Sequence, residues 1–331
     1  MASDATAPRR PRSLRERAGL GVGRSSGGLR ARAGAVPPQW RAYAALALGT
    51  VCIGWSGIFV KLAGVPGPAS AFYRLFFSVV VLLPWWLRAR PGRLSRRAFG
   101  LAAAGGVFFA LDLALWNAAV LLTSAGRATL LANVAPLWVG LGSVVLLGER
   151  LRLGFWAGMA VALAGVAVIV GAGGLGAATG VGDGLALLAS AFYAAYILTT
   201  RQVRVQLDTL SFMTLATLAS LPVLAGLSVA TGAPLAGYDA RAWLALLGVG
   251  LISQLVGWLA INFALGHLRS AVVAVTLLGQ PVLTAIFAVP VLGERLGMTD
   301  LAGGALVLGG IYWVHRTQER AAAVFSPTAS D

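Results

Sequence analysis

The sequence predicts an all-α membrane protein with ten transmembrane helices in two inverted five-helix repeats. Three observations lead to this fold class. Of the 331 residues, 58% are apolar and 11% are charged, whereas a soluble domain carries about 25% charged residues. The phrase Leu-Gly-Glu-Arg-Leu occurs twice, at Leu147–Leu151 and at Leu292–Leu296. Arginines gather in loops between long apolar segments, which is typical of a chain whose solvent is the bilayer.

A basic tail comes first. Residues 1–38 are rich in Arg, Gly, Ser and Pro and could not bury a core, so we expect a disordered cytoplasmic tail. An Arg-rich leader with few acidic residues is also typical of an organelle transit peptide, and this alternative stays open. A C-terminal tail, residues 317–331, is expected on the same side of the membrane.

Ten apolar segments follow the basic tail, each near the ~20 residues that a helix needs to cross the hydrocarbon core. They lie at about 41–62, 69–87, 98–121, 126–147, 153–172, 182–200, 209–230, 241–264, 271–292 and 299–315. Short loops with Gly and Pro separate most of them. Helices are favoured over strands because backbone groups in lipid must be satisfied within the segment.

The basic residues set the orientation. With the N-terminus in the cytoplasm, most of the 26 Lys and Arg residues fall on the cytoplasmic side, while Lys61, Arg127, Arg241 and Arg295 fall outside. This asymmetry follows the positive-inside rule and predicts that both termini are cytoplasmic. We expect a multi-pass protein of the cell (inner or plasma) membrane. The net charge of +15 lies in the tail and loops, so it does not indicate nucleic-acid binding.

The repeated phrase divides the chain into two halves, 39–175 and 176–316. The offset between the two phrases also carries Pro136 onto Pro281. Because each half has an odd number of helices, the first phrase falls at the cytoplasmic face and the second at the outer face. Inverted repeats of this kind are common in secondary transporters, which bind substrate between the halves near the bilayer midplane.

These features resemble the EamA branch of the drug/metabolite transporter superfamily over about residues 41–316. The matching motifs are Ala135–Leu137, Gly148–Leu151, Gln280–Val282 and Gly293–Leu296. Arg74, within Phe72–Leu75, also resembles the second-helix pattern of that family. The resemblance implies a carrier with a central cavity and alternating access, powered by an ion gradient or by exchange. The family includes exporters of amino acids and metabolites as well as drug-efflux proteins, so the resemblance does not identify the cargo.

Two charged residues lie within the apolar segments. Asp112 is deep in the third segment, where a charged side chain costs about 2.5–3.5 kcal/mol on insertion scales and should face the bundle interior. The matching position of the second half is Gly257, so the acid is specific to one half. Arg74 lies at a similar depth in the second segment. Two interpretations stay open. Asp112 and Arg74 form a structural ion pair, or Asp112 is a proton relay or a contact to a cationic group of the substrate while Arg74 binds a substrate carboxylate.

Polar and aromatic residues near these charges are further candidates for substrate binding or coupling. They are Trp116 and Asn117 in the third segment, Gln254, Trp258 and Asn262 in the eighth, and Trp55, Tyr193 and Tyr196 elsewhere. The residues of the eighth segment are spaced four apart and form one stripe. Because Gln and Asn need partners in hydrocarbon, we expect this stripe to line a central pocket together with Trp116.

Other motif residues are interpreted as structural. They are Glu149, Arg150, Glu294 and Arg295 at helix ends, where a charge pair would fasten a turn, and Pro136 and Pro281 within helices, where kinks are expected. A ridge of small residues over 154–162 permits close helix packing, either within the chain or in a homodimer.

The sequence contains no motif for catalysis, for a cofactor or for a metal. A Walker loop is absent, so ATP hydrolysis is not predicted. We therefore expect a secondary transporter rather than an enzyme. It would export a small metabolite, an amino acid or a drug-like compound, with proton coupling as one mode. Uptake by the same fold is an alternative, as are a lipid-modifying membrane enzyme and a membrane scaffold.

Overall fold

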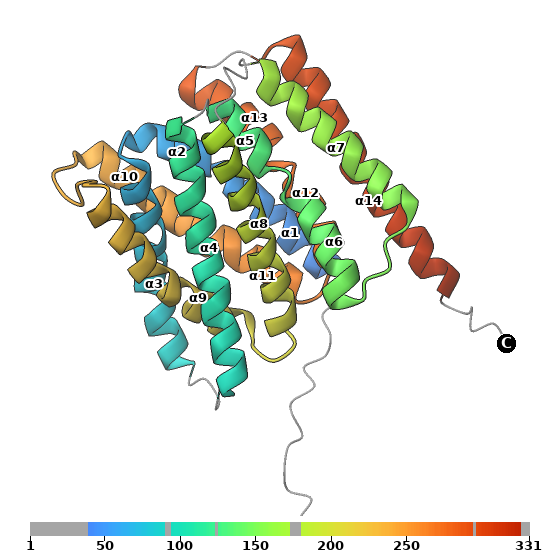
Figure 1. The fold of residues 1–331 in the computed structure, drawn as a ribbon, viewed down its shortest axis with the longest axis horizontal. Helices are drawn as coiled ribbons and strands as arrows, with labels where there is room; N and C mark the ends of the chain where they lie inside the picture. Colours follow the sequence, from blue (N-terminus) through green and yellow to red (C-terminus); the bar gives the residue numbers. More distant parts are fainter. Residues whose placement is uncertain (1–38, 90–93, 123–124, 173–179, 294–295, 326–331) are drawn as a thin grey trace, which may run out of the picture. The chain divides into compact units, whose positions relative to one another are not determined.

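The computed structural model describes residues 39–89, 94–122, 125–172, 180–293 and 296–325, which are helical with short connections and contain no strand (Figure 1). The helices are α1 (Gln39–Gly54), α2 (Ser56–Ala63), α3 (Gly67–Arg88), α4 (Arg96–Leu122), α5 (Ala125–Ala132), α6 (Ala135–Leu147), α7 (Leu153–Ala172), α8 (Gly180–Val203), α9 (Thr209–Ala230), α10 (Ala240–Gly248), the π-helix η1 (Val249–Gly257), α11 (Trp258–Leu265), α12 (Ser270–Leu277), α13 (Gln280–Leu292) and α14 (Met298–Phe325). The predicted N-terminal tail lies outside the described residues.

Nine helical stretches in the described part of the chain are long and apolar enough to cross a membrane. They are Gln39–Ala63, Gly67–Arg88, Arg96–Ala119, Ala128–Leu147, Leu153–Gly171, Gly180–Val203, Thr209–Ala230, Ala240–Leu265 and Ser270–Leu292, and we number them as spans 1 to 9. They coincide with the first nine predicted segments, which confirms a multi-pass membrane protein. The tenth predicted segment lies in α14, whose apolar run is shortened by Asp300 and by Tyr312–Arg316, so its crossing stays a prediction.

Spans 4 and 9 are each built from two helices that break next to a proline. In span 4 the break between α5 and α6 precedes Pro136, and in span 9 the break between α12 and α13 precedes Pro281. Proline has no N–H to donate, so it suits the first turn of a helix better than the interior. At the expected kinks the α-helical hydrogen bonding is therefore interrupted for one turn, while the junction residues Val134 and Gly279 keep right-handed helical dihedrals. α6 and α13 both end at a glycine in the left-handed region, Gly148 with φ 65° and Gly293 with φ 69°, which explains the glycine of the repeated phrase.

Span 8 contains a π-helical segment that the sequence pattern does not predict. η1 joins α10 to α11 and packs against α1 and α3. Its glycines permit this contact, because a Cβ added to Gly250 would lie 2.7 Å from the Cβ of Phe77. Segments of π-helix within α-helices often occur at functional sites, and this one directly precedes Trp258.

α7 and α14 lie side by side along the predicted ridge of small residues (Figure 1). A Cβ added to Gly158 would lie 2.9 Å from the carbonyl oxygen of Gly310, and one added to Gly165 would lie 2.6 Å from that of Gly303. The two backbones thus approach where side chains are absent, as small residues allow between membrane helices. The ridge packs within the chain, so it gives no support for a homodimer.

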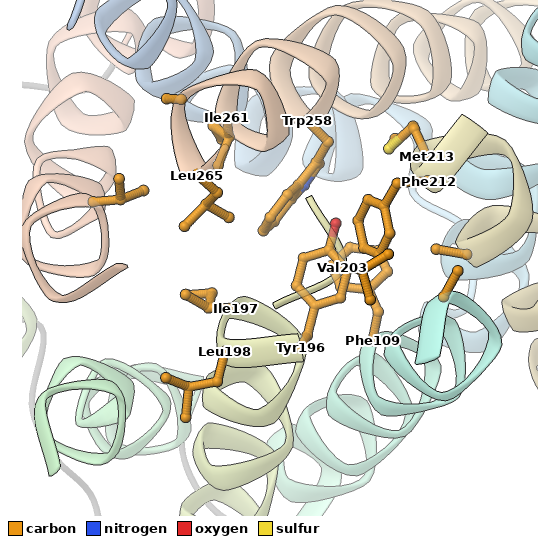
Figure 2. Close-up of a cluster of buried hydrophobic side chains, with 14 of the residues drawn as sticks. Phe109, Tyr196, Ile197, Leu198, Val203, Phe212, Met213, Trp258, Ile261 and Leu265 are labelled. Atoms are coloured by element: carbon orange, nitrogen blue, oxygen red, sulfur yellow. The ribbon is translucent and has the colours of Figure 1, made fainter. Parts of the chain in front are cut away.

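The largest buried cluster lies where α4, α8, α9 and α11 meet. Figure 2 shows its aromatic members, among them Phe109, Tyr196, Phe212 and Trp258. These side chains come from both halves of the sequence, so the cluster joins the two halves.

Candidate substrate site

Arg74 on α3 is the centre of a polar contact between three spans. Its Nε donates a hydrogen bond to Oε1 of Gln254 on η1 at 2.7 Å, and its Nη1 donates to Oγ of Ser56 on α2 at 3.2 Å. Gln254 and Ser56 are buried. A guanidinium carries five N–H donors, and these two contacts are its hydrogen bonds among the described residues. The remaining edge is therefore available to a ligand.

Asp112 on α4 lies close enough to Arg74 for the two charges to interact electrostatically. The carboxylate is partly exposed and accepts no hydrogen bond from the described residues. The expected ion pair is thus not a direct contact, because the guanidinium is oriented by Gln254 and Ser56. Arg74 and Asp112 therefore carry opposite charges near each other without forming a direct salt bridge.

Trp258 packs into an aromatic cluster (Figure 2). Its ring meets those of Phe109, Tyr193 and Tyr196 edge-on, with centroid distances of 5.0, 5.9 and 5.2 Å. Tyr196 also donates from its hydroxyl to Oδ1 of Asn262 at 3.0 Å. Gln254, which accepts the hydrogen bond from Arg74, precedes Trp258 by four residues in the same span, so the aromatic cluster and Arg74 lie on neighbouring turns of one site.

A small cavity adjoins this site. It has a volume of about 30 Å³ and is lined by Tyr193 and by residues at the two helix breaks, including Asn133, Pro136 and Gln280. A space of this size holds about one or two waters rather than a metabolite. Trp258, Tyr196 and Phe109 are buried and their rings contact one another, so cargo that reaches Trp258 has to move these rings apart.

Glu149 of the first repeated phrase contacts the start of span 9. Its Oε1 accepts hydrogen bonds from the backbone N–H of Ser270 at 3.0 Å and from Oγ of Ser270 at 2.9 Å, and Ser143 lies 2.9 Å from the same hydroxyl. Ser270 begins α12, whose first N–H groups have no partner within the helix. This corrects the interpretation of a charge pair with Arg150: Glu149 caps a helix of the other half. Glu294 and Arg295 lie outside the described residues.

The sequence model of the EamA-like transporter family matches the chain twice, over residues 40–171 and 180–316. The chain belongs to the EamA-like transporter family. This membership identifies a membrane transporter rather than the lipid-modifying enzyme that was one alternative. A solved crystal structure that is 21% identical superimposes with a TM-score of 0.71, covering 84% of this chain and 97% of the other, and so shares the fold.

Curated relatives of this EamA-like transporter have names that concern transport. An uncharacterized transporter of Archaeoglobus fulgidus is 27% identical over 275 residues, which cover 81% of this chain and 94% of the relative. A probable terminal-alkyne amino-acid exporter of Streptantibioticus cattleyicolor is 30% identical over 192 residues, 58% of this chain and 64% of that protein. The pseudopaline exporter CntI of Pseudomonas aeruginosa is 26% identical over 270 residues, 78% of this chain and 90% of that protein.

In this transporter the structure brings most of the candidate residues together. The cluster contains Arg74, Asp112, Tyr193, Tyr196, Gln254, Trp258 and Asn262. Three other candidates make no hydrogen bond or ring contact with these described residues. Asn117 donates to the carbonyl of Leu113 in its own helix, Trp55 stacks on Phe59 and Phe287, and Trp116 makes no hydrogen bond or ring contact with the cluster.

Phe109 and Ser56 belong to the site but were not among the predicted residues. Phe109 packs edge-on against Trp258. It precedes Asp112 by three residues, so it shares a helix face with the acid, and that spacing was a usable signal. Ser56 offers no comparable signal, because a lone serine in an apolar segment is usually bonded to its own backbone.

Proposed function

We propose that the chain is a secondary transporter that exports a small metabolite carrying both a carboxylate and a cationic group, as an amino acid does. The observation that carries this proposal is the pair of opposite charges within the spans, Arg74 and Asp112, which are half-buried beside one aromatic cluster without a direct ion pair. A guanidinium with free donors suits a carboxylate, and a carboxylate without hydrogen-bond donors suits an ammonium. The relatives named as exporters favour the outward direction, with uptake as the alternative.

The same carboxylate supports a route to proton coupling. Asp112 binds either a proton or the cationic group of the cargo, because a protonated carboxyl group is neutral and no longer attracts a cation. Alternating access would then exchange cargo for protons, with Asp112 discharged on one side of the membrane and loaded on the other. The structural reading, in which Asp112 only fastens helices together, predicts no such exchange.

Ten helices and two inverted repeats are part of this proposal, with α14 as the tenth span. The contacts between α7 and α14 support it. The offset of the repeated phrases carries Gly158 onto Gly303 and Gly165 onto Gly310. Gly158 contacts Gly310. The symmetry-related contact is therefore that of Gly303 with Gly165, and this contact is also present. A two-fold axis in the membrane plane relates contacts in this way. The double family match supports repeats over 39–175 and 176–316.

Orientation in the cell membrane is tested by reporter fusions. The charge asymmetry predicts that both termini and residue 150 are cytoplasmic and that residue 295 is outside. A reporter that is active only in the cytoplasm should work after residue 150 and fail after residue 295. Equal activity at both positions would contradict the inverted repeat.

Transport is tested in inverted membrane vesicles, where export appears as uptake. Radiolabelled amino acids are supplied with and without a pH gradient, and Arg74→Gln is compared with Arg88→Gln, an exposed arginine at the end of the same helix. A hydrogen bond to a charged group contributes about 1.5–3 kcal/mol, so Arg74→Gln should reduce transport of the carboxylate-bearing cargo by about tenfold or more. Equal transport by both variants would exclude Arg74 as the carboxylate-binding residue.

A further inference from the structure

The indole N–H of Trp258 is a buried donor without an acceptor. The side chain is 3% exposed, and Nε1 has no hydrogen-bond partner among the described residues. Two other tryptophans differ in this respect, because Nε1 of Trp86 donates to Oγ of Ser211 at 3.0 Å and Nε1 of Trp138 donates to Oγ of Ser190 at 2.9 Å. A buried Trp N–H usually finds a partner, and leaving it unpaired is costly.

The unpaired donor lies within the candidate site. The Trp258 ring contacts Tyr193 and Tyr196, which are candidate residues of the same site. Gln254, one turn earlier in span 8, accepts the hydrogen bond from Arg74. The guanidinium and the indole therefore approach one region from α3 and α11, and each has an unused donor.

The segment before Trp258 sets its position. η1 ends at Gly257, where a Cβ would lie 3.1 Å from the Cβ of Cys52 and from Cγ2 of Ile53. This close contact with α1 holds the turn that carries the indole, so the donor is fixed by the backbone and not by a side-chain hydrogen bond. Figure 2 shows the ring extending from α11 toward Tyr196 and Phe109.

We propose that the indole N–H of Trp258 is a specificity-determining donor that binds the carboxylate of the cargo together with the free edge of Arg74. The proposal rests on the proposed function, because it requires a carboxylate-bearing cargo. Cargo that separates the aromatic rings gives the N–H its missing acceptor. A compound without an acceptor leaves the N–H unpaired, so the transporter discriminates against it. A site built to hydrogen-bond one group rejects analogues that lack it for this reason.

The test measures ligand affinity by thermal stabilisation of the purified full-length protein. The twenty L-amino acids are screened first, and each that binds is compared with the amine that lacks its carboxylate, such as phenethylamine for phenylalanine. Trp258→Phe removes the N–H and keeps an aromatic ring. We expect it to weaken binding of the amino acid by about tenfold or more and to leave the affinity of the amine unchanged.

Trp86→Phe is the matched control, because it removes an indole N–H whose acceptor is the protein's own Ser211. It should lower the melting temperature without changing amino-acid affinity. If Trp258→Phe does not fold, 3-benzothienylalanine at position 258 replaces the N–H by sulfur within nearly the same ring shape, and the same loss is expected.

The outcomes separate the two proposals. Unchanged amino-acid affinity after loss of the indole N–H would overturn the role of Trp258 and leave the proposed function intact. An equal loss of affinity for acid and amine would also overturn it, because the effect would then be one of packing. If no amino acid binds the unaltered protein, the proposed cargo class and the role of Trp258 both fall.

Discussion

Substitution of Gly310 by alanine should force α7 and α14 apart. A Cβ at Gly310 would lie 2.5 Å from both the carbonyl oxygen of Gly158 and the backbone nitrogen of Ala162. Carbon and oxygen atoms normally approach to about 3.3–3.6 Å, so the helices would have to separate by about 1 Å. Both contacts are to backbone, which cannot rotate away as a side chain can. Overpacking of this kind costs about 1–3 kcal/mol.

The neighbouring glycine provides the control. A Cβ at Gly309 meets nothing within 4 Å, and alanine is favoured over glycine in a helix by about 0.8–1 kcal/mol. Gly309→Ala should therefore be neutral or stabilising, whereas Gly310→Ala should be destabilising. The assay is thermal unfolding of the detergent-purified protein. Equal melting temperatures for the two variants would refute the close packing of α14 on α7, and with it the support for a tenth span.

Three further predictions concern the site and the cap of α12. Asp112→Asn should fold and still exchange cargo but lose gradient-driven accumulation in vesicles; accumulation equal to that of the unaltered protein would exclude coupling through Asp112. Gln254→Leu removes the acceptor for Nε of Arg74 and should lower the free energy of unfolding by about 1.5–3 kcal/mol, measured by denaturant unfolding. An unchanged midpoint would show that this hydrogen bond contributes nothing to stability. Glu149→Ala should lower the free energy of unfolding by about 1–2 kcal/mol. Glu149→Gln should lower it by less, because the amide oxygen still accepts from the N–H of Ser270. Equal losses would show that the negative charge of Glu149, and not the hydrogen bond, stabilises the start of α12.

The sequence predicts the spans of this protein well because lipid imposes one strict requirement. An apolar run near 20 residues must satisfy its own backbone, so its existence and approximate ends can be read from composition. α14 is the exception, since polar residues at both of its ends make the run short. The candidate site was partly predicted for a similar reason: Asp112, Arg74 and Gln254 are polar residues that lipid cannot accommodate, so they must face one another or the cargo.

Contacts between distant segments were predicted less well. Phe109, which packs against Trp258, was not among the candidate residues. Helices that cross at an angle touch over only one or two turns, and the sequence does not say which turns. The partner of Glu149 was missed for the same reason, because Ser270 lies in the other half of the chain and becomes a neighbour only after folding.

The π-helical segment in span 8 also bears on how the chain tolerates changes of length. A π turn closes its hydrogen bonds one residue later than an α turn, so η1 holds more residues than an α-helix of the same rise. Removing one residue from an ordinary transmembrane helix rotates everything beyond it by about 100° and turns its buried face toward lipid. Within 249–257 the same deletion would instead let the segment relax toward α geometry, so that α10 before it and α11 after it, with Trp258 facing Tyr196, keep their buried faces. Single-residue deletions should therefore be accepted in this segment of span 8 and rejected in the corresponding turns of α4, and natural variation in the length of this helix is expected to concentrate there.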